Sequence, residues 1–459
     1  MRAVRCCLAL SAALAAGAAD ERSALDHPGV LALIAADPAA AAAAGGALFR
    51  HEFSTREGAG EARLGGRMRA ARAQSCIVCH NVPYGDAGAG ATVGRSGPAG
   101  RSTPHLFGAG ALEQLGEAIT ATLLARVDRD GDGSVIGGEA AEVRALIDPD
   151  GDGPEPVVDF GWFADRDGDG RPDLDPSLRI WFVDAAGRRL PSARRLGDPG
   201  VVGYRFAHGA FGWSADDGED PRATASLRTF IIGAFAAHAG IEADDTGLRE
   251  IDRSGRAAVT PTGSRPLVPG TAPDPGIRRD DAGRSLDDPD GDGVMAELST
   301  AEVDLVEFYL FRHRPPGERP DAPGAAAGRL RFAAIGCATC HAPEWRFPGR
   351  GDRRTGAADL TITGLYSDLR HHDLGADFHQ PRFDGGTTLR FRTPPLWGVG
   401  SSAPYGHDGA SLDLDAVIRR HGGEAASSAA AYRDLDADGQ LELVGFLRSL
   451  VLAPPADPR

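Results

Sequence analysis

The feature that most constrains this chain is a short segment that occurs twice, as SCIVCH at residues 75–80 and as GCATCH at residues 336–341. In each copy two cysteines are separated by two residues, and a histidine directly follows the second cysteine. Thiols at this spacing can form thioethers to the vinyl groups of haem, and the adjacent histidine then binds the iron from the proximal side. A four-cysteine zinc site and a pair of disulfides are the alternatives. The predicted attachment residues are Cys76, Cys79, His80, Cys337, Cys340 and His341.

The first residues, MRAVRCCLALSAALAAGAADER, combine two arginines with a short apolar run that ends in small residues. This pattern is typical of a secretory signal peptide, expected at 1–19, with an N-terminal segment at 20–44. The signal contains Cys6 and Cys7, so four cysteines remain in an exported chain. We therefore expect a periplasmic protein. No later stretch is long and apolar enough to suggest a transmembrane anchor.

Length and charge limit the classes of protein that remain. A chain of 459 residues usually needs two or three hydrophobic cores. Its net charge of -16 makes nucleic acid a poor partner, so none is expected. The chain contains no lysine, which excludes Schiff-base chemistry on a lysine side chain.

The region around the second motif has the organisation of a small helical domain. The segment AAAGRLRFAAIGCATCH predicts a short helix that leads into the attachment site, and DADGQLELVGFLRSLVL predicts a terminal helix that packs against it. Together they indicate a cytochrome-c-like domain at 325–455, preceded by a linker at 312–324. The apolar positions of the terminal helix are Leu441, Val444, Leu447 and Leu450.

The first motif lies in a larger region, 45–320, which is expected to form an N-terminal haem domain. The segment ALEQLGEAITATLLARV predicts an amphipathic helix after the motif. Acidic loops follow at about 126–200, where DRDGDGSVIGGE matches a twelve-residue calcium loop and DPDGDGPEPVVD is a weaker match. Similar segments at 165–173 and 288–293 are equally compatible with ordinary turns. The predicted calcium ligands are Asp128, Asp130, Asp132, Ser134, Glu139, Asp148, Asp150, Asp152 and Asp159.

Four further segments carry a family likeness: RSTPHLFGAGALEQL, GAFGWSA, LYSDLRHHDLG and FRTPPLWGVGSSAPYGHDGASLDLDAVIRRHGGEA. They resemble the di-haem oxidoreductase family of the bacterial di-haem cytochrome c peroxidase and MauG superfamily. The resemblance covers nearly all of the chain after about residue 45. It implies a mainly α fold with two cytochrome-c-like haem domains, long loops and an insertion that is rich in calcium loops.

The resemblance also implies different roles for the two haems. His421 stands where the family places the second ligand of the C-terminal haem, although it could instead cap a helix. On the N-terminal haem, His105 could bind the iron or lie at the haem edge, and an open position is the preferred interpretation. Glu113 and Glu117 could shuttle protons there, or they could be solvated carboxylates on a helix. His371, His372 and His407 are expected to form structural hydrogen bonds.

The leading interpretation is a peroxidase-like enzyme with two covalently attached haems c and calcium. The C-terminal haem takes electrons from a small electron-donor protein or a quinol-linked donor. The N-terminal haem reduces hydrogen peroxide or another small oxidant. A MauG-like oxidation of a protein or small molecule is the second enzymatic reading, and a di-haem electron-transfer cytochrome without catalysis is the third.

Overall fold

The computed structural model describes residues 25–59, 61–64, 67–70, 73–82, 87–90, 102–127, 135–136, 163–164, 173–174, 178–184, 199–208, 211, 226–241, 243, 260–263, 297–381 and 386–452. The expected signal peptide at 1–19 lies outside these residues. So do all of the predicted calcium ligands, namely Asp128, Asp130, Asp132, Ser134, Glu139, Asp148, Asp150, Asp152 and Asp159. The signal peptide and the calcium ligands therefore stay predictions.

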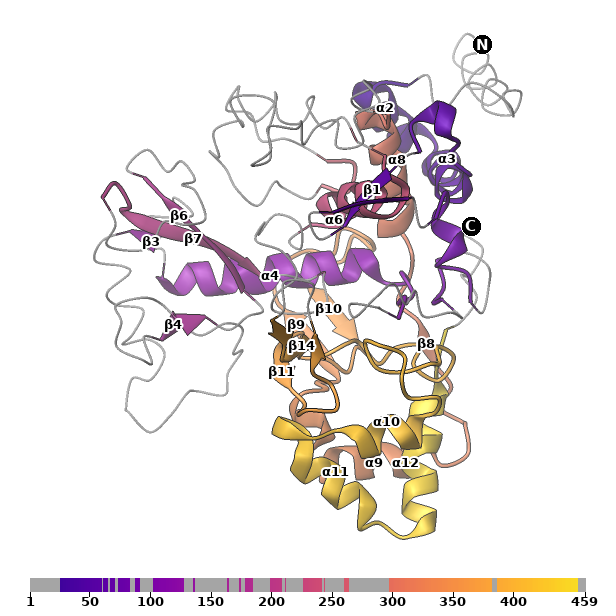
Figure 1. The fold of residues 1–459 in the computed structure, drawn as a ribbon, viewed down its shortest axis with the longest axis vertical. Coiled ribbons are helices and arrows are strands. Elements are labelled where there is room, and N and C mark those ends of the chain that lie inside the picture. Colours follow the sequence, from indigo (N-terminus) through magenta and orange to yellow (C-terminus); the bar gives the residue numbers. More distant parts are fainter. Residues whose placement is uncertain are drawn as a thin grey trace.

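The protein is mainly helical, as the sequence indicated, and its strands are short. The α-helices are α2 (His27–Ala36), α3 (Pro38–Arg50), α4 (Ala109–Val127), α6 (Leu227–Ala234), α8 (Thr300–Phe311), α9 (Ala325–Ala334), α10 (Leu414–Arg420), α11 (Ala426–Arg433) and α12 (Ala437–Ser449). Figure 1 shows α2, α3, α6 and α8 at one end of the molecule, α9 to α12 at the other end, and α4 running between them.

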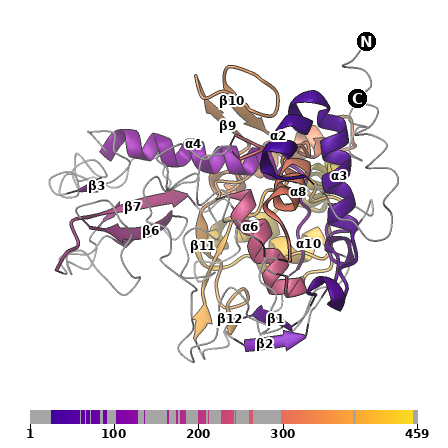
Figure 2. The ribbon, with the colours of Figure 1, turned by 90° about the horizontal axis from the view of Figure 1, so that it is seen from above.

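All strands pair in antiparallel fashion in small sheets. The pairs are β1 (Glu61–Leu64) with β2 (Arg67–Ala70), β4 (Phe163–Ala164) with β5 (Asp173–Leu174), β8 (Gly317–Glu318) with β15 (Leu450–Val451), β9 (Glu344–Phe347) with β10 (Leu360–Thr363), β11 (His371–Asp373) with β14 (Arg390–Arg392), and β12 (Gln380–Pro381) with β13 (Thr387–Thr388). A three-stranded sheet joins β3 (Val135–Ile136), β7 (Gly203–His208) and β6 (Leu178–Val183). Figure 2 shows β6 and β7 extending away from the helices beside α4.

Two helix pairs, α3 with α8 and α9 with α12, are built in the same way. A Cβ atom on Gly45 of α3 would overlap the Leu305 carbonyl oxygen of α8, and one on Gly328 of α9 would overlap the Glu442 carbonyl oxygen of α12. Each glycine therefore lets two helix backbones approach closely. Each pair leads into or closes around one cysteine motif, so the chain contains two related units.

The two helices predicted around the second motif are confirmed. Helix α9 ends just before the motif, and α12 packs against it. The Asp436 side chain accepts a hydrogen bond from the Gly439 N–H at the start of α12, as an N-cap does. One detail was wrong, because Leu441 is 68% exposed instead of lying on the buried face.

A hydrophobic cluster joins the two units. Helix α4 contributes Leu115 and Ile119, and β10 contributes Leu360 and Ile362, around the buried Trp397 ring. The predicted linker, 312–324, is held in place because its strand β8 pairs with β15, which follows α12. No helix in the described part of the chain is long and apolar enough to cross a membrane.

Candidate functional site

The two cysteine motifs fold into the same local turn. The first forms the 3₁₀ turn η2 (Cys76–Val78) and the second forms η6 (Cys337–Thr339). In each motif the backbone N–H of the histidine donates to the carbonyl of the first cysteine at 3.0 Å. Within the described chain none of the four cysteines forms a disulfide. The turn therefore places two thiols and one imidazole in the same relation in both units.

The histidines of the two motifs are oriented by equivalent hydrogen bonds. His80 Nδ1 lies 2.9 Å from the Pro104 carbonyl oxygen, and His341 Nδ1 lies 2.9 Å from the Tyr366 carbonyl oxygen. A carbonyl only accepts hydrogen bonds, so Nδ1 carries the proton and Nε2 keeps its lone pair. Burial lowers the pKa of both imidazoles to about 4, which leaves them neutral at pH 7. A neutral imidazole held through its second nitrogen is the form that binds a metal.

An aromatic ring from the preceding helix lies beside each of these histidines. The ring centroids of Phe49 and His80 are 6.3 Å apart, and those of Phe332 and His341 are 6.1 Å apart. The two glycines of the helix crossings stand four residues before these phenylalanines in the sequence. The repeat of glycine, phenylalanine and motif was a signal that sequence reasoning had missed.

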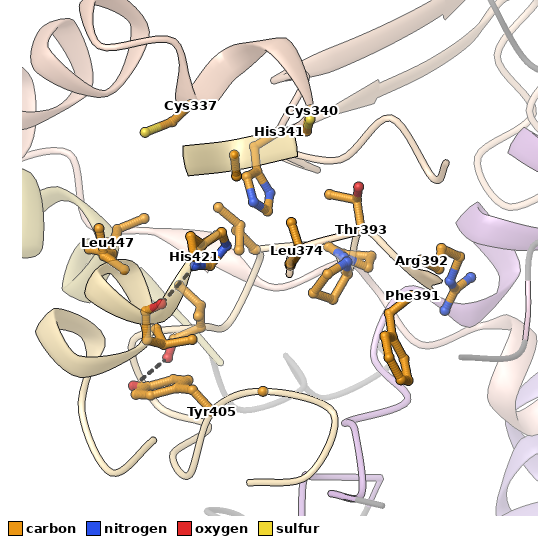
Figure 3. Close-up of a pocket in the computed structure, with 18 of the residues that line it drawn as sticks. Cys337, Cys340, His341, Leu374, Phe391, Arg392, Thr393, Tyr405, His421 and Leu447 are labelled. Atoms are coloured by element: carbon orange, nitrogen blue, oxygen red, sulfur yellow. Dashed lines mark hydrogen bonds between the residues drawn. The ribbon is translucent and has the colours of Figure 1, made fainter. Parts of the chain in front are cut away.

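A cavity of about 750 Å³ lies beside the second motif and extends to the N-terminal unit, where His105 and Phe230 line it. Its volume lies in the range of ~300–1,000 Å³ that is usual for cofactor sites. Figure 3 shows Cys337, Cys340 and His341 on one side of this cavity and His421 facing His341 from the other side. Apolar side chains such as Leu374 and Leu447 complete the walls. Two thiols and two opposed imidazoles in an apolar cavity fit a covalently attached haem with two axial ligands.

His421 is positioned by the helix that precedes it. Asp413 caps α10 by accepting a hydrogen bond from Ala416 N–H, and His421 is the residue at which the helix ends. Its Nδ1 lies 2.7 Å from the Val417 carbonyl oxygen, so Nε2 again keeps the lone pair. Burial lowers the pKa of His421, which favours the neutral form.

The loop after His421 is held by β11 through a second histidine. His372 contacts Asp368 through Nε2 at 2.9 Å and Glu424 through Nδ1 at 2.7 Å. Glu424 also accepts a hydrogen bond from the backbone N–H of Asp373 at 3.0 Å. These structural hydrogen bonds of His372 agree with the expectation from the sequence. We call the pair His372 and Glu424 the loop clamp.

Cys340, Asp368 and His372 form the one group in the described chain whose side chains could together hold a metal ion, with ligand atoms within 4.8 Å of one another. Both ring nitrogens of His372 already face carboxylates, so neither offers a lone pair to a metal. Cys340 also belongs to the second cysteine motif. The group therefore fits the haem site better than a separate metal centre.

The turn that contains His407 packs between the two units. The His407 ring stacks on Phe391 with centroids 3.8 Å apart, and the His407 carbonyl oxygen accepts from Ser102 N–H at 2.7 Å. Asp408 forms an ion pair with Arg420 at 2.6 Å, at the end of α10. His371 is buried in the neighbouring strand β11. This turn thus supports the helix that carries His421.

His105, a predicted ligand of the N-terminal haem, lies at the junction of the two units. Its Nε2 is 2.9 Å from the Trp397 carbonyl oxygen, and burial lowers its pKa to about 4. In this arrangement Nε2 carries the proton and donates to that carbonyl, and Nδ1 keeps the lone pair. Its role as a ligand stays a prediction.

The two predicted catalytic carboxylates lie on α4 in different surroundings. Glu113 is fully buried and its Oε1 accepts from Leu227 N–H at 2.9 Å. Burial and the neighbouring Glu307 raise the pKa of Glu113 well above its usual value, which favours the protonated carboxylic acid. Glu117 forms an ion pair with Arg353 at 2.6 Å, and the same guanidinium lies 3.6 Å from Glu113 Oε2. Burial favours the protonated form of Glu113, whereas Glu117 is partly exposed beside Arg353.

Comparisons with known proteins agree with this site. Residues 296–450 match a family described as "Di-haem oxidoreductase, putative peroxidase", and this segment contains the second motif and His421. The resemblance drawn from the sequence is therefore confirmed, and the family implies haem as the cofactor. The class of protein that the match supports is a di-haem oxidoreductase.

Two solved structures also resemble the chain at low identity. Hydrazine synthase from Kuenenia stuttgartiensis shares 19% identity with a TM-score of 0.24, over 33% of this chain and 56% of that chain. A MauG-like protein associated with microbial copper homeostasis shares 17% identity with a TM-score of 0.29, over 54% of this chain and 75% of that chain. The chain thus spans little more than half of the hydrazine synthase chain. No curated protein matches it.

Proposed function

We propose that this protein is a periplasmic di-haem c-type oxidoreductase with peroxidase-like activity. Cys76 and Cys79 hold one haem with His80 as the proximal ligand. Cys337 and Cys340 hold the other haem, between His341 and His421. Electrons from a small donor protein or a quinol-linked donor enter at the C-terminal haem. Hydrogen peroxide is reduced to water at the N-terminal haem, whose iron, when bound, supplies the redox chemistry.

The observation that carries this proposal is a difference between two equivalent helices. In the C-terminal unit Asp413 caps α10, and His421 follows eight residues later. In the N-terminal unit Ser226 caps α6, and the residue eight positions later is Ala234. An alanine has no atom that can bind iron. The N-terminal haem therefore keeps a position for a small molecule where the C-terminal haem has a histidine.

The equivalence of α6 and α10 has further support from the side chains on the same faces. Val417, one turn before His421, lines the cavity of the C-terminal unit, and Phe230, one turn before Ala234, lines the part of the same cavity that reaches the N-terminal unit. The two helices also pack on equivalent partners, α6 on α8 and α10 on α12. The equivalence of α6 and α10 is therefore supported by their packing partners as well as by the number of residues after each cap.

Glu113 gives the N-terminal unit a proton that peroxide reduction requires. Its carboxyl group binds the N–H of Leu227, the first residue of α6, so it stands at the start of the helix that carries Ala234. Burial raises the pKa of Glu113, which favours its protonated form, and a carboxylic acid in this position can donate a proton as bonds to oxygen break.

Oxidation of a protein or small molecule, as in MauG, is the second candidate function. The observation that favours it is the position of Trp397, which is buried between the units and lines the cavity. An oxidisable ring at this place could carry an electron between a distant substrate and the N-terminal haem.

The test of the main proposal closes the N-terminal position with a new ligand. In the reduced wild-type protein we expect carbon monoxide to bind one haem of two. Ala234→His should remove that binding and at least 90% of the peroxide-dependent oxidation of a reduced electron donor. Carbon monoxide binding and oxidation of the donor can both be followed by visible absorption. Mass spectrometry of each variant checks that the two haems are attached.

The matched control is Gly233→His on the neighbouring position. A Cβ atom at Gly233 meets no other atom of the described residues, and Arg420, its equivalent on α10, donates to Asp408 and does not line the cavity. This variant should keep both carbon monoxide binding and activity. If wild-type protein binds no carbon monoxide, both haems are six-coordinate and the electron-transfer cytochrome is the correct reading.

A further inference from the structure

Helix α6 does not end at Ala234 but continues as the π-helix η5 (Phe235–Ala239), which carries His238. We propose that the His238 imidazole lies over the edge of the N-terminal haem, on the side away from His80, and transfers the proton of a bound small molecule. The inference rests on the accessible N-terminal haem of the proposed function. Neither the family match nor the sequence motifs singled out this residue.

The face of the helix on which His238 stands is the first support. In the C-terminal unit Val417, His421 and Ala425 follow one another at four-residue steps, and all three line the cavity. Counted from the two cap residues, the matching positions are Phe230, Ala234 and His238. The neighbouring stripe of α6 and η5, which contains Ile231 and Phe235, is buried in the N-terminal core, and Phe230 packs against that core. Helix α10 ends at His421, whereas α6 continues into η5, so His238 stands one turn further along the stripe that begins at the cavity-lining Phe230.

The position of η5 relative to the first motif is the second support. The backbone N–H of Ala73, three residues before Cys76, donates to the carbonyl oxygen of His238 at 3.2 Å. In the C-terminal unit a Cβ atom on Gly336, just before Cys337, would lie 3.0 Å from the Oγ of Ser428, a residue that lines the cavity. In both units the chain beyond the ligating position thus reaches the attachment segment.

The two units also have similar electrostatics. Burial is the main cause of the low pKa of His80 and of His341, and a charge on His238 lowers the first further, as a charge on His421 lowers the second. The His238 side chain is exposed, unlike the half-buried His421, so it can exchange protons with water. A π-helical turn inside a helix is a common feature of functional sites.

The distance along the helix from Ala234 to His238 favours proton transfer by His238 over ligation of the iron. A residue one turn beyond the ligating position is displaced by about 5.4 Å along the helix axis. His238 therefore stands beside the iron and not above it, within reach of a small molecule bound there. Its imidazole can take a proton from one peroxide oxygen and deliver it to the other, which leaves as water. With two electrons from the donor and two protons in total, one peroxide yields two waters.

The experiment measures cyanide binding to the oxidised protein at pH 7, because hydrogen cyanide must lose its proton to bind iron as cyanide. His238→Ala should slow cyanide association by about 10²-fold, the usual contribution of a positioned acid or base. Its absorption spectrum before cyanide should equal that of wild type. The matched control is His51→Ala, another histidine of the N-terminal unit, which contacts Glu57 and should leave the rate unchanged.

Two results would overturn the inference. An association rate in His238→Ala equal to that of His51→Ala would show that His238 moves no proton. A change of one haem from six to five ligands in His238→Ala would make it an axial ligand instead. Slow cyanide binding in the variant, combined with no peroxide reduction by wild type, would support His238 and reject the peroxidase function.

Discussion

The imidazole Nε2 of His105 lies 2.9 Å from the Trp397 carbonyl oxygen and joins the surroundings of the two cysteine motifs. The preceding residue, Pro104, accepts the hydrogen bond from His80 in the N-terminal unit. Trp397 lines the cavity that contains His341 in the C-terminal unit. Two hydrogen bonds and one short piece of backbone thus connect the two sites. A displacement of residues at one site can therefore be transmitted to the other site through these two hydrogen bonds.

The His105 contact predicts a specific dependence of stability on pH. The pKa of His105 falls from 6.5 to about 4 in the folded protein because the ring is buried. Between these values the unfolded chain binds more protons than the folded one, so the free energy of unfolding falls as the pH falls. The full loss is about 3 kcal/mol for this shift. Above pH 6.5 the contribution is complete.

The measurement compares wild type with His105→Gln by urea denaturation at pH 7 and at pH 4.5. Glutamine can still donate to the Trp397 carbonyl but does not titrate. We expect the variant to lose less stability than wild type between the two pH values. Equal losses would mean that His105 is protonated in the folded protein or is exposed to water.

The helix crossings give a second prediction. Gly45→Ala and Gly328→Ala should each lower the free energy of unfolding by about 1–3 kcal/mol, because the new Cβ overlaps a backbone carbonyl that cannot move freely. Helix propensity alone would favour alanine by about 1 kcal/mol, so the sign separates the two effects.

Gly233→Ala is the matched control for these crossings, since a Cβ atom there meets nothing. It should stabilise the protein slightly, as expected for alanine inside a helix. Thermal unfolding of all three variants, followed by circular dichroism, checks the prediction. Stabilisation by Gly45→Ala would show that α3 and α8 are further apart than described.

The C-terminal unit was largely predictable from the sequence, and the reason is local. The spacing in the second motif and the apolar period of α9 and α12 lie within short segments, so pattern reading found them. The pairing of α3 with α8 joins segments that are far apart in the sequence. No local sequence pattern indicates that α8 is the helix that packs against α3. The exposed Leu441 shows the same limit, because a periodic position does not reveal which neighbour covers it.

The orientation of the histidines could not be predicted for a different reason. Pro104 and Tyr366 hold His80 and His341 through backbone carbonyl oxygens. Every residue has such an oxygen, so the identity of the partner leaves no trace in the sequence. Only the fold decides which carbonyl is near. The same argument applies to the Trp397 carbonyl that contacts His105.

The loop clamp predicts how firmly His421 is held. His372→Ala removes both contacts of that ring and frees the loop that begins at His421. A hydrogen bond to a charged group contributes about 1.5–3 kcal/mol, so the fraction of protein with His421 detached should rise tenfold or more. Reduced protein should then bind carbon monoxide at both haems.

His379→Ala serves as the control for the clamp, because His379 contacts Asp373 at 2.8 Å but does not touch Glu424. It should bind carbon monoxide as wild type does. If both variants behave alike, the hold on His421 comes from the backbone contact between Gly422 and Leu374 and not from the clamp.

Removal of calcium should lower thermal stability if the acidic loops are filled. A ligand that binds only the folded protein raises the melting temperature, so a chelator should lower it and added calcium should restore it. Asp128→Asn combined with Asp132→Asn should abolish this response. A chelator effect of equal size in the double variant would assign the calcium to another site.

The last prediction concerns the potential of the C-terminal haem. An iron between two histidines lacks the thioether sulfur that raises the reduction potential, so His421→Met should shift the potential of this haem to more positive values. Arg419→Met is the control, because Arg419 faces Asp415 at the surface and its methionine cannot reach the cavity. Spectroelectrochemical titration should show the shift in the first variant alone. Equal potentials in the two variants would mean that His421 only ends α10, through its contact with the Val417 carbonyl.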